Sequence, residues 1–358
     1  MRSWGRIRAS GRSTGTTGSG SRLRVAILGA GFAGTFHAQA WAGVEGAEIA
    51  AIVDSDLARA RAVAAQFGGE PAAPLERALA ADVDVVDVCL PTALHDEATI
   101  AAVQAGKHVL CEKPIALDLA RADRMIAAAG EAGVTFMVAH VLRFWPEYDR
   151  LRALAEDGSL GRLRVLTCSR LVTTPGPYAP WLLDPGQGLG LVEVAIHDLD
   201  IVTALLGRPS AVVASGLRDE TGWSHLHALL RFDGVAAASV EVGWHVPEAQ
   251  PFAAGFRARF ERGIVEYDSR RRPTLAIARD EGVEEVEVDA PGKTEGGPWA
   301  FDVAGYVREV EYFAGCVRDG RPPERCPPEA GRQALELSLA VLESAADGRE
   351  VVLPRSEG

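Results

Sequence analysis

The sequence predicts an α/β fold with a doubly wound parallel sheet, followed by a second, α+β domain with a large, open, mostly antiparallel sheet. Three observations predict this fold class. From residue 23 to about residue 141, apolar runs alternate with helical stretches, a pattern typical of a parallel sheet with helices on both faces. The alternation stops after Phe144-Trp145-Pro146, and residues 211–289 then read as successive strands. A length of 358 residues allows about two domains.

The first domain is expected to span residues 23–142. Its strand candidates are nearly continuous in Val, Ile and Leu, as expected for strands that are buried on both faces. These strand candidates are residues 23–28, 48–53, 83–90, 108–111 and 135–140. The helical segments between them are residues 33–43, 56–67, 95–105 and 118–132.

The second domain is expected to span residues 143–355. A helix (147–157), a strand (163–173) and a Gly/Pro-rich loop lead to a second helix that contains the segment EVAIHDLD, residues 193–200. The strands that follow include a hairpin around Asp233-Gly234, a favoured turn pair. Two amphipathic helices, at about 301–319 and 328–346, close the chain.

The composition argues against several classes of protein. The net charge is −12, and −17 without residues 1–22, which hold five arginines and no acid. A body this acidic argues against nucleic acid as the main partner, and no apolar run approaches the ~18 residues of a membrane span. The five cysteines form no CxxC pair, so reduced thiols in the cytoplasm fit better than disulfides or zinc. Residues 1–22 are rich in Gly, Ser and Thr and have no apolar period, so we expect a disordered extension or a start assigned too far upstream. A transit peptide is the alternative.

The motif GAGFAG, residues 29–34, follows the first strand and opens the first helix. Gly29 permits a tight turn, Gly31 lets a pyrophosphate approach the backbone, and Gly34 lets helix and strand pack closely. The motif therefore indicates a Rossmann dinucleotide-binding domain. The alternative interpretation is a glycine turn in some other α/β protein.

Two further features support dinucleotide binding. Phosphates bound at the motif would meet the free N–H groups of the helix N-terminus, around Phe32 and Ala33. Asp54 ends the second strand, 20 residues past Gly34, where an acid would accept hydrogen bonds from an adenosine ribose. Asp54 would also repel a 2′-phosphate, so NAD is expected in preference to NADP, although Arg59 and Arg61 lie close in sequence.

Polar residues follow two later strands of the first domain. The segments CLPTALH (89–95) and LCEKP (110–114) end these strands, and ligands bind beyond the carboxyl ends of strands in an open α/β sheet. For Thr92 and His95 the alternative is a helix cap with a polar neighbour. The candidates for cofactor contact at these two ends are Pro91, Thr92, His95, Glu112 and Lys113.

The helix with EVAIHDLD carries three ionisable groups on one narrow stripe. Glu193, His197 and Asp200 coincide on a helical wheel, whereas Asp198 lies nearer an apolar side. A solvated stripe more often carries Lys, Arg or Glu at every turn. The stripe therefore suggests a site in the crevice, and the alternative is a glutamate favoured by the helix dipole beside a satisfied histidine.

Together these residues resemble the glucose–fructose oxidoreductase/inositol dehydrogenase family (Gfo/Idh/MocA). The resemblance covers roughly residues 23–355 and depends on GAGFAG, PTALH, EKP, RFWP (143–146) and EVAIHDLD in the same order. It implies an N-terminal Rossmann domain and NAD(P)-dependent oxidation of a secondary hydroxyl of a sugar or cyclitol. It also implies a homo-oligomer, a dimer or tetramer built on the free face of the second sheet.

The resemblance assigns roles to individual residues. Lys113 would hydrogen-bond the reacting hydroxyl, His197 would act as the base, and Glu193 would orient or polarise His197. All three would also contact the substrate. Arg143 is a further possible substrate contact, and the 174–190 loop offers aromatic surface for a sugar ring through Tyr178 and Trp181.

The sequence departs from the family pattern at two positions. The family helix usually reads Asp-x-x-x-His, where this chain has Glu193, and Ala93 stands where the family loop often has Asn. Two other functions remain open, an NAD-dependent, redox-neutral glycoside hydrolase and a non-catalytic dinucleotide-sensing regulator.

His225 and His227 share one face of a strand, but no third ligand has metal spacing, so no metal site is predicted.

Overall fold

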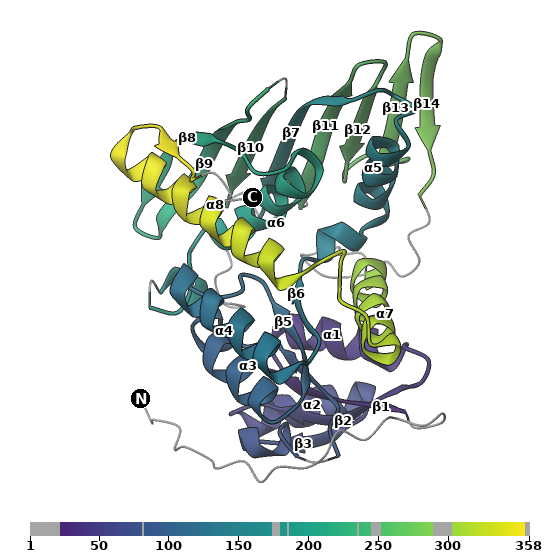
Figure 1. Cartoon of the computed structure of the whole chain (residues 1–358), viewed down its shortest axis with the longest axis vertical. Coiled ribbons are helices and arrows are strands. Elements are labelled where there is room, and N and C mark those ends of the chain that lie inside the picture. Colours follow the sequence, from purple (N-terminus) through teal and green to yellow (C-terminus); the bar gives the residue numbers. More distant parts are fainter. Residues whose placement is uncertain are drawn as a thin grey trace.

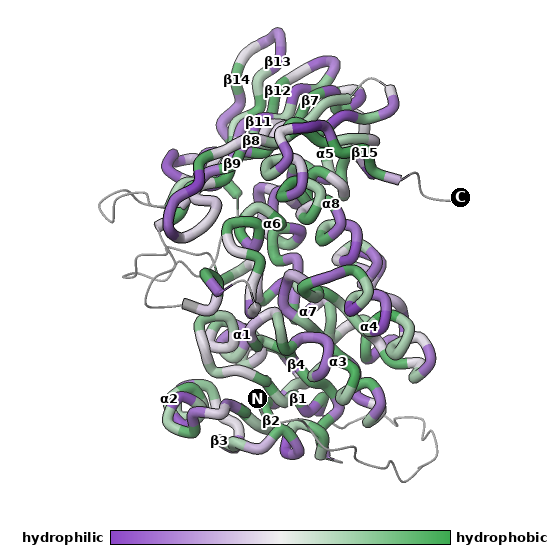
Figure 2. The backbone as a smooth tube through the Cα atoms, turned by 90° about the vertical axis from the view of Figure 1, so that its left-hand side faces the viewer, coloured by the Kyte–Doolittle hydropathy of each residue, from purple (hydrophilic) through white to green (hydrophobic). Residues whose placement is uncertain are grey.

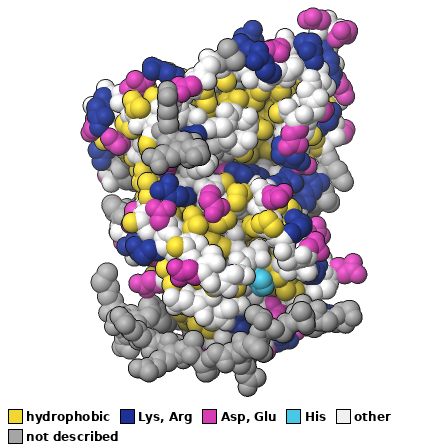
Figure 3. Space-filling model, in the orientation of Figure 1, with side chains coloured by type: hydrophobic (Ala, Val, Ile, Leu, Met, Phe, Trp, Pro, Cys, Tyr) yellow, Lys and Arg dark blue, Asp and Glu magenta, His cyan; other side chains and the backbone are white. Residues whose placement is uncertain are grey.

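The computed structural model describes residues 22–80, 82–173, 180–184, 186–234, 236–244, 252–288 and 303–354. These residues form two sheets at opposite ends of the molecule (Figure 1). The predicted extension lies outside the described residues up to position 21. Acidic and basic side chains are interspersed over the face shown in Figure 3. None of the described helices combines the length and apolar character that crossing a membrane requires.

The first sheet has six parallel strands in the order β3-β2-β1-β4-β5-β6. The strands are β1 (Leu23–Leu28), β2 (Ala47–Val53), β3 (Glu70–Ala72), β4 (Val85–Val88), β5 (His108–Glu112) and β6 (Phe136–Ala139). The helices are α1 (Phe32–Ala42), α2 (Leu57–Phe67), α3 (His95–Gln104) and α4 (Leu119–Ala132). The predicted doubly wound parallel sheet is confirmed. Only β3 was missed, because three residues that include a proline carry no readable periodicity.

The second sheet has nine strands in the order β14-β13-β12-β11-β7-β10-β9-β8-β15. Among these, only the pairing of β7 with β10 is parallel, so the predicted mostly antiparallel sheet is confirmed. The strands are β7 (Leu163–Leu171), β8 (Ala211–Asp219), β9 (Gly222–Arg231), β10 (Ala237–Gly243), β11 (Ala253–Phe260), β12 (Ile264–Asp268), β13 (Leu275–Arg279), β14 (Gly282–Val286) and β15 (Val351–Val352).

One face of the second sheet is covered and the other is open. Figure 1 shows α5 (Pro146–Asp157), α6 (Val192–Leu206) and α8 (Pro328–Asp347) on the side toward the first domain. Along β9, Leu226, Ala228 and Leu230 are buried on that side, whereas His227 and Leu229 are exposed on the other. The strands of this sheet in Figure 2 accordingly mix hydrophilic and hydrophobic residues. We call the uncovered side the open face.

The two closing helices contact the first domain as well as the second. Helix α7 (Val303–Asp319) packs on α1, and α8 packs on α4 and β6 as well as on α6 and β8. A Cβ atom at Gly331 would lie 2.8 Å from Cγ2 of Val138, and Leu335 belongs to the buried cluster around the first sheet. The predicted boundary at residue 142 therefore separates the two sheets, but the last two helices join them.

A buried ion pair fixes α6 to the second sheet. Arg170 of β7 donates from Nε to Asp198 Oδ2 at 2.7 Å and from a terminal nitrogen to Oδ1 at 3.0 Å. Both side chains are buried, and Tyr148 lies 3.3 Å from the same guanidinium. The pair places the backbone of His197, the preceding residue, at a defined point over the sheet.

We expect Arg170→Met to lower the free energy of unfolding by about 3–5 kcal/mol, because it leaves Asp198 buried without its partner. Arg257→Met is a matched control, since Arg257 pairs with Glu266 on the exposed side of the same sheet at 3.0 Å, and its loss is expected to cost under ~1 kcal/mol. Urea unfolding followed by circular dichroism gives both values. Equal losses of unfolding free energy in the two variants would show that the buried pair contributes no more to stability than the exposed pair.

Candidate active site

The glycine motif forms a close-packed turn with one open position. Gly29 has a φ of +100°, and a Cβ atom there would lie 2.4 Å from the carbonyl oxygen of Cys89. A Cβ atom at Gly34 would lie 1.8 Å from the carbonyl oxygen of Gly29, whereas one at Gly31 would meet nothing within 4 Å. Gly29 and Gly34 are therefore required by packing, and Gly31 leaves space beside the backbone for a ligand.

The N-terminus of α1 fits a bound phosphate. The helix begins at Phe32, its first turn includes Ala33, and no side chain caps it. Free N–H groups at a helix N-terminus attract anions, and Gly31 leaves the approach open. These residues fit the pyrophosphate of a dinucleotide.

Asp54 stands at the end of β2 and holds the neighbouring turn. Its Oδ2 accepts a hydrogen bond from the Ala30 N–H at 2.8 Å, and its Oδ1 accepts from the Asp56 N–H at 2.8 Å. Arg59 donates to the same Oδ1 at 2.9 Å. Asp54, the predicted ribose contact, is thus already paired with the guanidinium of Arg59.

His95 joins the two loops that follow β4 and β5. Its side chain is buried, Nδ1 lies 2.8 Å from the carbonyl oxygen of Pro114, and Nε2 lies 2.8 Å from that of Leu90. Burial lowers the pKa of this imidazole. Both ring nitrogens face backbone carbonyls, so His95 positions the loops that carry Thr92 and Lys113.

Glu193 of α6 receives hydrogen bonds from both of these loops. Its Oε1 accepts from the Thr92 hydroxyl at 2.9 Å and from the Leu189 N–H at 3.0 Å. Its backbone carbonyl accepts from Nζ of Lys113 at 3.0 Å. The structure therefore brings together Thr92, Lys113 and Glu193, which are far apart in the sequence.

Burial shifts the pKa values of Glu193 and His197, both on α6, in opposite directions. Desolvation raises the pKa of Glu193 to about 7, against the ammonium of Lys113, which lowers it. Desolvation lowers the pKa of His197 well below its usual value, and the positive charges of Lys113 and Arg170 lower it further. Nδ1 of His197 is buried without a hydrogen-bond partner among the described residues. The imidazole is therefore neutral and able to accept a proton.

The orientation of Glu193 differs from the expected one. Its carboxylate contacts Thr92 and Leu189 and makes no hydrogen bond to His197 in the described part of the chain. The helical wheel placed both residues correctly on one stripe, but it carries no information on side-chain rotation. Glu193 meets the first domain instead of the imidazole.

Glu112 turns away from the crevice into a buried network. Its carboxylate lies 3.2 Å from Nε2 of His37 and accepts the Lys113 N–H at 2.9 Å. His37 in turn lies 2.8 Å from Asp87, which also accepts from Trp41 at 2.6 Å. The network fixes the backbone of Lys113 through the hydrogen bond from its N–H to Glu112. Sequence reasoning missed His37 and Asp87, which sit inside apolar segments without motif spacing.

The predicted substrate contacts divide into two cases. Arg143 binds Asp200 through two hydrogen bonds of 2.7 and 2.8 Å and the carbonyl oxygen of Arg325 at 2.6 Å, so its guanidinium faces protein groups. Trp181 lies in a short 3₁₀ helix, Pro180–Leu183, half-buried beside Gly188. Tyr178, the other predicted aromatic contact, lies outside the described residues.

Pro91, a predicted cofactor contact, lies just before Thr92 in the loop after β4.

His140 is a buried histidine that sequence reasoning missed. It follows β6, and neither ring nitrogen has a hydrogen-bond partner among the described residues; Nδ1 lies 3.6 Å from Asp200. Burial lowers its pKa to about 4. Its position directly after a parallel strand was the signal that could have revealed it.

The comparisons with known proteins agree with this geometry. Residues 23–140 match the oxidoreductase family with an NAD-binding Rossmann fold, and residues 148–266 match the GFO/IDH/MocA C-terminal domain. The UDP-N-acetylglucosamine 3-dehydrogenase of Acidithiobacillus ferrooxidans is 35% identical over 335 residues, covering 89% of this chain and 96% of that protein. The chain belongs to the Gfo/Idh/MocA oxidoreductase family.

Two further similarities extend over the whole fold. The inositol 2-dehydrogenase of Rhizobium meliloti is 27% identical over 343 residues, which is 92% of this chain and 98% of that protein. The structure of a levoglucosan dehydrogenase with NADH and levoglucosan has a TM-score of 0.82 at 24% identity, covering 94% of this chain and all of that one, and shows the shared fold. The resemblance drawn from the motifs is confirmed, and the chain is a dehydrogenase with a nicotinamide-dinucleotide-binding domain.

The pKa of Glu193 predicts a pH-dependent difference in stability. Because the folded pKa is raised from 4.5 to about 7, the folded chain holds a proton that the unfolded chain has released between these pH values. Stability is therefore lost as the pH rises through this window. We expect Glu193→Gln to gain about 2–3 kcal/mol relative to the unaltered protein between pH 5 and pH 8.

Chemical denaturation at several pH values measures this difference. The glutamine keeps the volume and one acceptor for Thr92, so the comparison isolates the charge. A difference in stability that stays constant from pH 5 to pH 8 would show that the carboxyl titrates normally.

Proposed function

We propose that this chain transfers hydride from a secondary hydroxyl-bearing carbon of a sugar or cyclitol to NAD, or in the reverse direction. The observation that carries the proposal is the half-buried imidazole of His197, whose pKa is lowered by desolvation and by the charge of Lys113. The ammonium of Lys113 contacts the same helix, and the chain carries a dinucleotide-binding turn. Sugar and cyclitol dehydrogenases among the relatives support the substrate class.

His197 acts as the base. Oxidation of the alcohol releases a proton from oxygen, and the imidazole accepts it because the low pKa leaves the ring unprotonated at neutral pH. The dinucleotide, when bound at Gly31 and Asp54, supplies the acceptor for the hydride. A positioned base of this kind contributes typically ~10²–10⁴-fold to the rate.

Lys113 holds the reacting oxygen. Its ammonium donates to the carbonyl oxygen of Glu193 at 3.0 Å, and an ammonium has three donors, so others remain for a hydroxyl. A cation placed there stabilises negative charge as it develops on oxygen. Glu193 acts as a positioning residue, since it contacts Lys113 and Thr92 and sets the distance between α6 and the loops.

Lys113→Met tests this assignment. We expect kcat to fall by about 10²–10³-fold, while the affinity for NAD, measured by nucleotide fluorescence, changes little because the methionine keeps the length of the chain. The substrate for the assay comes from a turnover screen with NAD against inositols, hexoses, pentoses and sugar acids, followed at the absorbance of NADH.

Two outcomes would contradict the assignment. A near-normal kcat would remove Lys113 from the reaction, and an equal loss of NAD affinity and rate would assign it to cofactor binding. A screen that consumes a glycoside without net change in NADH absorbance would favour the redox-neutral hydrolase.

NAD is the proposed cofactor in preference to NADP. Asp54 presents a carboxylate at the ribose position and holds Arg59 at 2.9 Å, so the nearest cation is already neutralised. We expect kcat/KM with NAD to exceed that with NADP by ~10-fold or more, which corresponds to at least about 1.4 kcal/mol. Asp54→Ser is expected to lower the ratio of kcat/KM with NAD to kcat/KM with NADP.

Asp56→Ser is the matched control for this cofactor test. Asp56 is an exposed carboxylate that approaches the same guanidinium at 3.6 Å and caps α2, and serine preserves the cap. The ratio should remain as in the unaltered protein. Equal or better turnover with NADP in the unaltered protein would overturn the preference for NAD.

A cytoplasmic location is proposed from the thiols. All five cysteines are free and buried. Free thiols persist in a reducing compartment.

We propose that the open face forms a homodimer or homotetramer. Five of the large apolar residues that are exposed in the described chain lie on this face, and they are Val213, Leu217, Leu229, Val283 and Val352. A sheet face of this kind without covering helices is typical of an interface. The occupant that we propose is a second copy of the chain.

Leu229→Asp tests the interface, because it places a charge on an exposed apolar residue of the open face. Light scattering at micromolar concentration should give at least twice the 37.9 kDa of one chain for the unaltered protein and a smaller mass for the variant. Leu94→Asp, at an exposed leucine of the first domain, should leave the mass unchanged. A monomeric unaltered protein would exclude this interface.

A further inference from the structure

Two histidines and a glutamate meet on the open face, away from the active site. His225 and His227 of β9 lie on the same side of the strand, and Glu241 of β10 pairs directly with His227 across the ladder. Nε2 of His225 lies 3.2 Å from Oε1 of Glu241, and Nε2 of His227 lies 4.0 Å from the same oxygen. One ligand atom from each residue lies within 4.8 Å of the other two.

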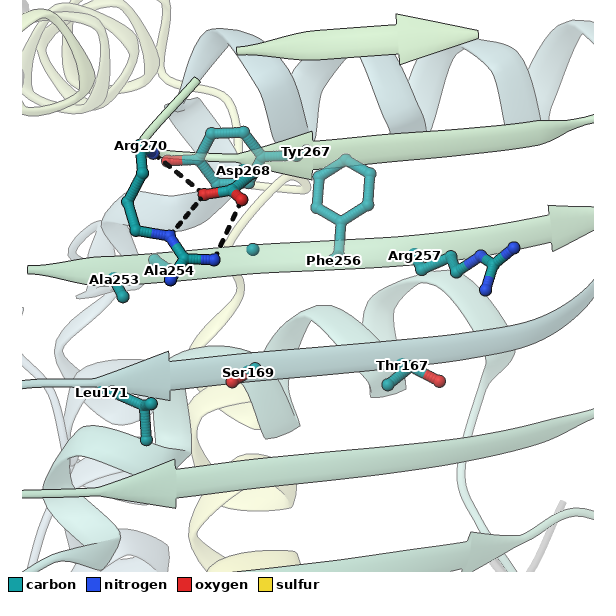
Figure 4. Close-up of a pocket in the computed structure, with 11 residues that line it drawn as sticks. Thr167, Ser169, Leu171, Ala253, Ala254, Phe256, Arg257, Tyr267, Asp268 and Arg270 are labelled. Atoms are coloured by element: carbon teal, nitrogen blue, oxygen red, sulfur yellow. Dashed lines mark hydrogen bonds and ion pairs between the residues drawn. The ribbon is translucent and has the colours of Figure 1, made fainter. Parts of the chain in front are cut away.

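The surrounding residues shape this cluster. A Cβ atom at Gly243, the partner of His225 in the ladder, would lie 2.5 Å from Nδ1 of that ring, so only glycine leaves the ring its place. Ser169 of β7 donates to Oε2 of Glu241 at 2.8 Å, which leaves Oε1 to face the histidines. Ser169 and Thr167, which Figure 4 shows on β7, both line a pocket.

These positions fit a zinc ion. Tetrahedral Zn²⁺ with ligands at 2.0–2.1 Å separates its ligand atoms by about 3.3 Å, so the 3.2 Å contact already fits and the 4.0 Å contact needs a small rotation of one imidazole. Two imidazoles and a carboxylate are a common zinc ligand set, and a hydrogen bond to the ligating carboxylate is the usual supporting contact.

We propose that His225, His227 and Glu241 bind one Zn²⁺ per chain on the open face. The sequence alone did not predict this, because Glu241 stands 14 residues past His227 and only the antiparallel register of β9 and β10 brings it alongside. The site does not depend on the proposed reaction, since its residues lie on the open face, whereas α6 lies on the covered face of the same sheet (Figure 1). It lies on the face that the proposed oligomer would cover.

Zinc binding is measured on the full-length, tag-free protein, dialysed against Zn²⁺ and analysed for bound metal and for affinity by calorimetry. We expect one Zn²⁺ per chain in the unaltered protein, and at least a 10-fold weaker affinity in His225→Ala, His227→Ala and Glu241→Gln. Ser169→Ala is expected to weaken binding by about 10–100-fold, because it removes a supporting hydrogen bond and no ligand.

Two controls keep the result specific. Glu266→Gln changes a carboxylate on the same face but outside the cluster and should leave zinc affinity unchanged. Gly243→Ala retains all three ligands but displaces the His225 ring, and it should also weaken binding. Affinity for NAD, measured on every variant, confirms that the chain is folded.

Absence of bound zinc in the unaltered protein would overturn the proposal. Equal zinc affinity in a His225→Ala/His227→Ala double variant would do the same, because it would place the ion elsewhere, for example at the buried group of His37, Asp87 and Cys89. The oligomer test is independent, since a monomer that binds zinc would contradict only the interface.

Discussion

Glu193 accepts hydrogen bonds from both loops that follow β4 and β5, and the geometry of the crevice depends on these contacts. Its carboxylate takes the Thr92 hydroxyl and its carbonyl takes the ammonium of Lys113. Helix α6 is itself fixed to the second sheet by the Arg170–Asp198 pair. The distance between the dinucleotide turn and the imidazole of His197 is thus set by a continuous series of hydrogen bonds from one sheet to the other.

Burial decides the charge state of this crevice. The two aspartates of α6 each pair with their own arginine, Asp198 with Arg170 and Asp200 with Arg143. Neither carboxylate therefore stabilises the protonated form of His197. Desolvation then dominates, raising the pKa of Glu193 and lowering that of His197. Both shifts favour the neutral form of the side chain, so the His197 imidazole is unprotonated at neutral pH.

The sequence predicted the elements whose signals are local. Continuous apolar strands, the glycine turn and Asp54 depend on residues that are close in the chain, and the family motifs located Lys113 and His197. The direction of the Glu193 carboxylate, the binding of Arg143 to Asp200 and the approach of Glu241 to the histidines could not be predicted. They depend on side-chain rotation and on strand register, which only the tertiary fold determines.

The core of the first domain depends on helix α8, which is synthesised much later than the strands that it covers. The helix follows all strands of the first sheet in the chain, yet Leu335 fills the core of that sheet and Gly331 packs on Val138 of β6. A ribosome that has released only residues up to about 327 therefore presents a first domain whose apolar surface is still uncovered on one side. The dinucleotide-binding half therefore completes its core only after α8 has been synthesised, and until then its exposed apolar surface makes the nascent chain prone to aggregation.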